Sequence, residues 1–184
     1  MRRWFPGIAA ILLVAAMMNP LWRLTAQRAQ AAPAATVQIR IGVYDPRAVA
    51  IAYAHSQFNK EKMSPKLDEL AKAKAAKDQA KITELATWGK DQQMRLHLQG
   101  FAGAPVDDLM AQVKEQIPAV AAAANVQSIG LRPDYTAPGV EVVDVTDDLV
   151  KLWSPDARTL KMIAGVRATA PIAIEQIAKM GPND

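Results

Sequence analysis

Paired carboxylates are the residues of this sequence that could perform acid–base chemistry. They occur at Asp107/Asp108 and at Asp147/Asp148, and Asp144 lies close to the second pair. Adjacent residues of a helix point in different directions, so neither pair is arranged for general acid–base catalysis. Each pair also precedes apolar residues at helical spacing, where carboxylates favour the positive end of the helix dipole. The carboxylates therefore indicate the starts of helices.

The other residue types that carry chemistry are isolated. His55 and His97 are far apart in the sequence, and neither has a neighbour at metal-ligand spacing. Gly100 and Gly103 precede no Gly-Lys-Ser/Thr, so no phosphate-binding loop is indicated. There is no cysteine, which excludes disulfides, thiolate metal sites and cysteine nucleophiles. The sequence predicts a protein that is not an enzyme and that uses no cofactor or metal.

The elements that would position these residues begin with a strand. Residues 37–45, VQIRIGVYD, alternate with period two, which predicts a strand with one buried face. That face holds Val37, Ile39, Ile41 and Val43. Asp45-Pro46 then predicts a helix start, with the aspartate as N-cap and the proline at the first helical position.

The middle of the chain has the composition of long amphipathic helices. Residues 60–99 are rich in Ala, Lys, Glu, Gln and Leu and carry a narrow apolar stripe. A second helix, with a kink at Pro118, is predicted over residues 107–125. Together they predict an antiparallel hairpin over about residues 60–125. Two places for its reversal stay open, Gly89 and the turn signal Gly100–Pro105.

Two further strands and several helices follow. Short strands are predicted within residues 126–135 and over residues 140–144. The next helix has Asp144 or Thr146 as its cap, and its apolar residues from Leu149 to Trp153 would pack on the sheet. Residues 154–184 predict a helical extension of two helices divided at Ala170–Pro171. The fold class is therefore α+β, a small β-sheet body with a protruding antiparallel α-helical hairpin and extra C-terminal helices.

The N-terminal residues 1–31 have the form of an export signal. Two arginines precede an uncharged run, and Ala29-Gln30-Ala31 offers a cleavage site before Ala32. The alternative is an uncleaved inner-membrane anchor over residues 4–22. Basic residues before the run place the body on the exported side in both cases, which predicts the periplasm.

Charge outside this leader is balanced. Four of the 22 basic residues lie in the leader, and the other 18 equal the 18 acidic residues. A nucleic-acid-binding protein would carry a clear basic excess in its folded part, so no nucleic-acid partner is expected.

Three stretches together resemble the Skp/OmpH-like family of periplasmic chaperones for outer-membrane proteins. These stretches are IRIGVYDPRAVAIAYAHS, IPAVAAAANVQSIGLRP and VEVVDVTDDLVKLW, and the likeness covers residues 37–153. The resemblance implies a homotrimer whose helical hairpins form prefoldin-like, "jellyfish" arms. It also implies an ATP-independent holdase that keeps unfolded outer-membrane proteins between those arms. The helices after Trp153 depart from the family pattern. The alternative is a membrane-anchored structural or adaptor protein of the envelope that binds one partner through those helices.

Two groups of hairpin residues are candidates for contacts with clients. The lysines could meet acidic clients or an anionic membrane surface, and their alternative role is a solvated helix face. The apolar residues could be exposed for binding, and their alternative role is packing between the two helices. The candidates are Lys66, Lys72, Lys74, Lys77, Lys81, Trp88, Met94, Leu98 and Phe101.

Overall fold

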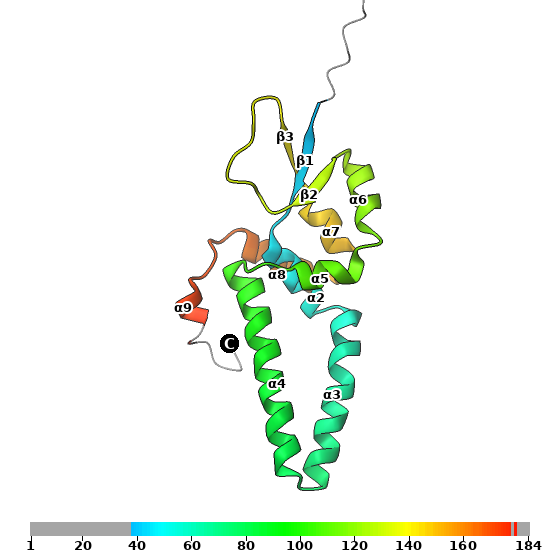
Figure 1. Ribbon diagram of the computed structural model, residues 1–184, viewed down its shortest axis with the longest axis vertical. Helices are drawn as coiled ribbons and strands as arrows, with labels where there is room; N and C mark the ends of the chain where they lie inside the picture. The colour runs from blue at the N-terminus through cyan, green and yellow to red at the C-terminus, as the bar shows by residue number, and fades with distance from the viewer. Residues whose placement is uncertain (1–37, 178, 180–184) are drawn as a thin grey trace, which may run out of the picture. The chain divides into compact units, whose positions relative to one another are not determined.

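The computed structural model describes residues 38–177 and 179 of the chain. The predicted leader, with its alternatives of cleavage and anchoring, lies outside the described residues. Gln38 onward forms one compact unit of helices and a three-stranded sheet, which confirms the α+β class (Figure 1).

The sheet is parallel and its central strand is the first in sequence. β1 (Arg40–Val43) lies between β2 (Ser128–Gly130) and β3 (Glu141–Asp144), in the order β2-β1-β3. Gly42 is the register partner of both Ile129 and Val143. All three strands therefore end at the same edge of the sheet.

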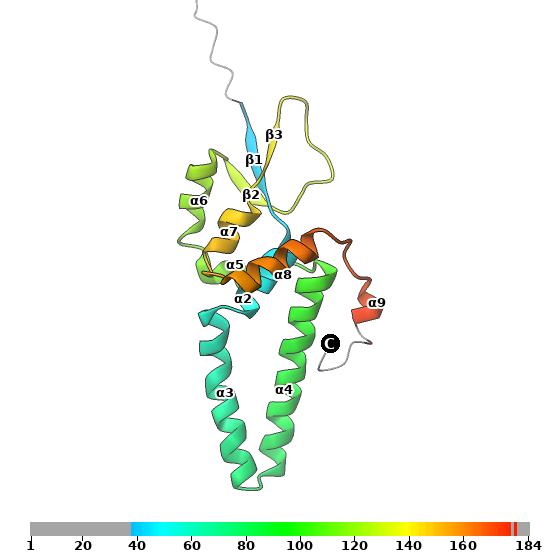
Figure 2. The ribbon, with the colours of Figure 1, turned by 180° about the vertical axis from the view of Figure 1, so that it is seen from behind.

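One face of the sheet packs on helices and the other does not. A Cβ on Gly42 would lie within 3.0–3.2 Å of Ile129, Val126 and Val145, so this face is tightly filled. Helices α6 (Ile117–Ala124) and α7 (Thr146–Lys151) lie on this side (Figures 1 and 2). Ile39, on the opposite face, is 53% exposed.

The predicted buried face of β1 is therefore wrong in part. Val43 is buried, but Ile41 is only half-buried and Ile39 is exposed, because no described helix covers their side of the sheet. The face that packs on the helices instead carries Gly42, whose missing side chain lets Val145 approach the strand. Val37 lies outside the described residues.

The core is built around α2 (Pro46–Ala54). Asp45 caps it by accepting a hydrogen bond from the Arg47 amide, and Pro46 is its first residue, as the sequence predicted. Three of its alanines, together with Val49 and Tyr53, join a buried cluster with Leu149, Val150 and Trp153. The apolar residues after Thr146 thus pack where they were expected to.

The C-terminal helices belong to this core. α8 (Ala157–Arg167) packs on α2 and buries Ile163. α9 (Ile174–Ile177) packs near η1 (Leu98–Ala102), a π-helical turn that continues the helix α4 (Gln79–His97). The Ile172 amide also donates a hydrogen bond to the Phe101 carbonyl, at 2.9 Å.

Two long helices extend from the core. α3 (Gln57–Ala75) and α4 (Gln79–His97) are joined by residues 76–78 and lie side by side in Figures 1 and 2. The seam between them buries Ala73 and Leu85. No helix in the described part of the chain is both long and apolar enough to cross a membrane.

The reversal lies at residues 76–78, so neither position offered by the sequence is used. Gly89 is inside α4, and Gly100 belongs to η1. Lys77 takes a left-handed conformation, with φ 57°, after α3. The amides of Lys77 and Asp78 donate to the carbonyls of Lys74 and Ala73, which is the hydrogen-bond pattern of a Schellman motif. Asp78 then caps α4 by accepting from the Lys81 amide.

The predicted single helix over residues 107–125 is also divided. α5 (Asp107–Met110) and a 3₁₀ turn, η2 (Ala111–Val113), precede α6. Pro118 lies in the first turn of α6 and does not kink a longer helix, since a missing N–H costs nothing there. This segment packs beside the sheet and not along α3.

Gly42→Ala tests the tight helix-covered face. The added Cβ would contact Ile129, Val126 and Val145 closely, so we expect the free energy of unfolding to fall by about 1–3 kcal/mol. Gly130→Ala is the matched control, because a Cβ there meets nothing within 4 Å. Its stability should be unchanged or raised by up to about 1 kcal/mol. Urea unfolding measures both, and equal losses would contradict the packing described.

Candidate functional site

A cavity lies where α3 and α4 leave the core, and we call it the root cleft. Its volume is ≈ 440 Å³ and its walls come from α2, α3, α4 and η1. The lining residues are Ala50, Ile51, Ala54, His55, Asn59, Met63, Gly89, Gln92, Gln93, Leu96, His97, Gly100 and Phe101. The cleft is therefore a largely apolar hollow between a fixed core helix and two long helices.

Polar contacts next to the cleft fix the base of α4. Asp108 accepts hydrogen bonds from Arg95 at 2.9 Å and from the buried Gln99 at 2.7 Å. The Lys62 ammonium donates to the Gln92 side-chain oxygen across the two helices, at 2.9 Å. Partial burial and then the charge of Arg95 lower the pKa of Lys62, although Asp108 acts in the opposite direction. Asp108, predicted only as a helix start, also ties α5 to α4.

The described lining of the root cleft contains no Lys, Arg, Asp or Glu. Its polar members are amides and the imidazoles of His55 and His97. The rings of His97 and Phe101 form a tilted pair, with centroids 5.6 Å apart and planes at 59°. A largely apolar surface with ring edges favours apolar groups over ions.

Gly89 opens the cleft on the α4 side. It lies in the interior of α4, where glycine costs about 1 kcal/mol of helix stability relative to alanine. A Cβ at this position would meet nothing within 4 Å. The missing side chain therefore enlarges the cavity and relieves no clash.

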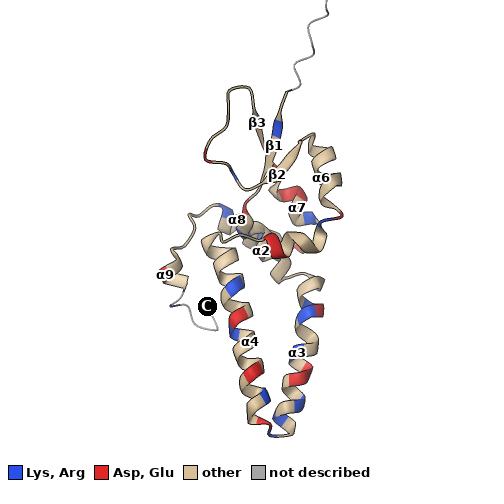
Figure 3. Ribbon diagram, in the orientation of Figure 1, with Lys and Arg blue, Asp and Glu red and all other residues tan. Residues whose placement is uncertain are grey.

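The predicted lysines do not form a separate basic face. Lys66 pairs with Glu69 at 3.0 Å, and Lys81 pairs with Glu84 at 2.8 Å. Lys72 and Lys74 lie in the last turn of α3, and Lys77 forms the reversal. Figure 3 shows blue and red residues interspersed along both helices. The lysine positions thus belong to an exposed surface of mixed charge.

Of the predicted apolar residues, Phe101 lines the root cleft. Trp88 and Leu98 are half-buried and are sequence neighbours of residues that line the cleft. Met94 is exposed on α4. The residues predicted for the tip thus lie away from it, with Trp88 in the middle of α4 and Phe101 in η1, because the chain reverses at residues 76–78 and not after Gly100.

Sequence reasoning missed that His55 and His97 share one cavity. Both line the root cleft, since the reversal returns the end of α4 to the start of α3. The Asp78 cap was the available signal for this reversal. Across residues 38–177 and 179, no group of three or more His, Asp or Glu side chains is placed to hold a metal ion.

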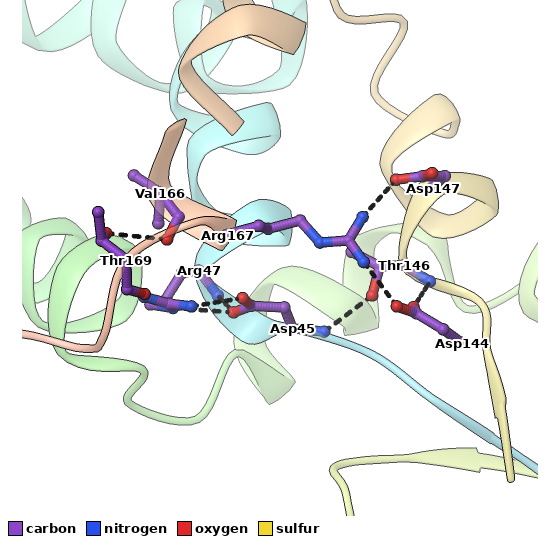
Figure 4. Close-up of polar contacts among 8 residues, drawn as sticks. All are labelled: Asp45, Arg47, Asp144, Thr146, Asp147, Val166, Arg167 and Thr169. Atoms are coloured by element: carbon purple, nitrogen blue, oxygen red, sulfur yellow. Dashed lines mark hydrogen bonds and ion pairs between the residues drawn. The ribbon is translucent and has the colours of Figure 1, made fainter. Parts of the chain in front are cut away.

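The aspartates near residue 144 form a joint at the carboxyl edge of the sheet (Figure 4). We call this group, with Asp45, Arg47, Thr146 and Arg167, the edge joint. Arg167 donates to Asp144 at 2.5 Å and to Asp147 at 2.7 Å, which ties α8 to the start of α7.

The other contacts of the edge joint link the end of β1 to the start of α7. The Thr146 hydroxyl accepts a hydrogen bond from the Asp45 amide at 3.0 Å. The buried Arg47 pairs with Asp45 at 2.7 Å and donates to the Thr169 carbonyl at 2.9 Å. A cavity of ≈ 430 Å³ adjoins these paired charges. The aspartates are thus engaged in holding strand and helix ends together, as the sequence predicted for Asp144.

The pKa of Asp144 reflects this role. Burial acts to raise it, but hydrogen bonds from the side chain and amide of Thr146 and the charges of Arg167 and Arg132 outweigh burial, so the pKa lies below its usual value. The Asp144 side-chain oxygen accepts from the Thr146 amide at 2.9 Å. The N-cap of α7 is Val145, so neither Asp144 nor Thr146 occupies the cap position that the sequence offered them. Asp144 binds the first amide of α7 from the residue before the cap, while the Thr146 hydroxyl binds the Asp45 amide just after β1.

The described chain is thus an α+β protein with a largely apolar cavity between its core and two exposed helices. No protein-family model, no curated protein and no solved structure matches the chain.

Asp144→Asn tests the edge joint through pH. Because the folded-state pKa of Asp144 is lowered, its stabilising contribution is present above the unfolded value of about 4 and is lost as pH falls through the folded value. Urea unfolding between pH 7 and pH 2.5 measures this contribution. We expect the free energy of unfolding of the variant to fall less on acidification than that of the wild type. Asp134→Asn, in the exposed loop before β3, is the control. An identical acid loss in wild type and Asp144→Asn would contradict this role.

Proposed function

We propose that this protein is an exported, ATP-independent holdase that binds unfolded outer-membrane proteins and works as a homotrimer. In this proposal α3 and α4 are the antiparallel hairpin arm that contacts the client. The uncovered face of the sheet makes the trimer. The export signal predicted from residues 1–31 and the sequence resemblance are the reasons for choosing this class of client.

The observation that carries the proposal is how little α3 and α4 bury. Each helix is 19 residues long, yet only Ala73 and Leu85 are buried in them. Helices in proteins owe most of their stability to the packing of an apolar face. Two long helices that pack this sparsely on their own chain are suited to packing on another one.

The exposed residues of this helix pair fit an unfolded client. Leu67 is 57% exposed on α3, and Met94 and Phe58 are also exposed. They are set among lysines and carboxylates of both signs (Figure 3). Scattered apolar contacts within a surface of mixed charge favour many weak interactions over one strong one, which is what a holdase needs.

The uncovered face of the sheet supports self-association. Ile41 on β1 and its partner Val142 on β3 share this face with Ile39, which directly precedes β1, and none belongs to the buried core cluster. A three-stranded sheet with one bare apolar face and two short edge strands is stabilised when a further layer covers it. A second and third copy of the chain would supply that layer.

Ile39→Lys tests the trimer. A charge in the centre of the proposed interface should convert the trimer to monomer, measured by mass photometry as a fall to one third of the mass. Gln38→Lys is the matched control, because Gln38 lies on the other side of the strand and bonds to Glu141. A wild-type monomer, or a trimer unaffected by Ile39→Lys, would overturn this interface.

Aggregation suppression tests the holdase activity. Light scattering of a urea-unfolded porin on dilution should fall in the presence of the purified protein without ATP. Leu67→Ser with Met94→Ser should weaken the effect severalfold, since both side chains are exposed on the helix pair. Leu160→Ser with Ile174→Ser, equally exposed but on α8 and α9, should not. No suppression by wild type, together with one specific partner in a pull-down, would favour the adaptor alternative.

A further inference from the structure

We propose that the root cleft binds one aromatic side chain of the captured polypeptide. This inference rests on the proposed holdase function and names the chemical feature that the protein recognises in a client. Four properties of the cleft lead to it: its size, its missing side chain, its lack of charge and its ring edges.

The size of the cleft fits a buried side chain. Its ≈ 440 Å³ falls within the range of about 300–1,000 Å³ typical of ligand sites. The space exists in part because α4 has a glycine at position 89, where an added Cβ would meet nothing within 4 Å. A glycine in a helix interior weakens the helix, so its presence here favours an open cavity over a filled one.

The charge distribution disfavours an ionic guest. The helices beside the cleft carry many charged residues, yet the described lining contains no Lys, Arg, Asp or Glu. Lys62 and Arg95, on these helices, both donate to Gln92. A charged group entering the cleft would lose its hydration without meeting a carboxylate, lysine or arginine in the described lining.

The lining favours an aromatic ring over an aliphatic chain. The tilted rings of His97 and Phe101 present an edge or a face to a third ring. Met63 contributes a thioether, and sulfur–ring contacts are favourable. At the wall formed by α2, Ile51 and Ala54 supply a fixed apolar surface, because α2 belongs to the core. The amides of Asn59 and Gln92 lie in the same lining, where the polar backbone of a client could bond.

The fit of the cleft to an aromatic ring is tested with two blocked amino acids as probes. N-acetyl-phenylalaninamide is titrated into protein labelled at its methionine methyl groups for NMR. The Met63 methyl signal is assigned by its loss in Met63→Leu. The ring current of a bound phenylalanine would shift this signal. We expect saturable shifts, and binding several times tighter than that of N-acetyl-leucinamide, as an added ring–ring contact predicts. Equal affinity for the two probes, or no movement of the Met63 signal, would overturn the aromatic site.

Gly89→Leu fills the cleft while favouring the helix. It should weaken binding of the phenylalanine probe at least tenfold and should also weaken suppression of porin aggregation. Gly165→Leu is the matched control, because Gly165 is also a helical glycine with open space around it but lies on α8, outside the cleft. Circular dichroism checks the fold. Should the leucine variant not fold, Gly89→Ala must still reduce the affinity relative to Gly165→Ala.

The two proposals fail in different ways. If wild type suppresses aggregation and Gly89→Leu does so equally well, the aromatic site is overturned and the holdase stands. If the probe binds and Gly89→Leu abolishes its binding, but wild type does not suppress aggregation, the holdase is overturned. The occupant is then a free aromatic molecule, which overturns the client assignment as well.

Discussion

The structure depends on the parallel pairing of β1 with two strands that lie far along the chain. β1 occupies the centre of the sheet, and its partners β2 and β3 follow it by roughly 85 and 100 residues in register, as the pairs Gly42–Ile129 and Gly42–Val143 show. A parallel partner cannot be reached by a tight turn, so the chain must leave the carboxyl edge of the sheet and return to its other end. The connection from β1 to β2 contains α2 to α6. The α3–α4 pair is therefore an extension of a crossover that the sheet already requires.

The same pairing explains why charged residues collect at one edge. Parallel strands end together, so Asp45 after β1 and Asp144 at the end of β3 meet there, and α2 and α7 both begin there. Carboxylates are favoured at both helix starts by the helix dipole, and nearby cations offset the repulsion between the two carboxylates. Arg47 supplies one cation from α2 and Arg167 the other from α8. This requirement gives the C-terminal helices a structural role: α8 covers α2 and neutralises the joint at the end of the strands.

Local signals in the sequence predicted most elements, and the errors have identifiable causes. The Asp45-Pro46 start of α2, the strand before Thr146 and the helices after Trp153 follow from caps, β-branched residues and proline, and all are present. The reversal at Lys77 was missed because a lysine takes the left-handed position that glycine usually fills, at a cost of roughly 1–2 kcal/mol. The choice of buried face on β1 could not be made from alternation alone, since it depends on which side α6 and α7 cover. The root cleft depended on the reversal, so it could not be predicted while the reversal was misplaced.

The exposed helix pair and the root cleft both result from the sparse packing of α3 and α4. α3 and α4 contact the core chiefly at their bases, where Asp108 holds Arg95 and Gln99, and beyond that they contact mainly each other. A wider apolar seam would close the gap between their bases, and a side chain at Gly89 would fill it. Each change would stabilise the free protein and remove surface available to a partner. Under the function we propose, a bound polypeptide would supply the missing contacts, so that binding and the stability of these helices would be thermodynamically linked.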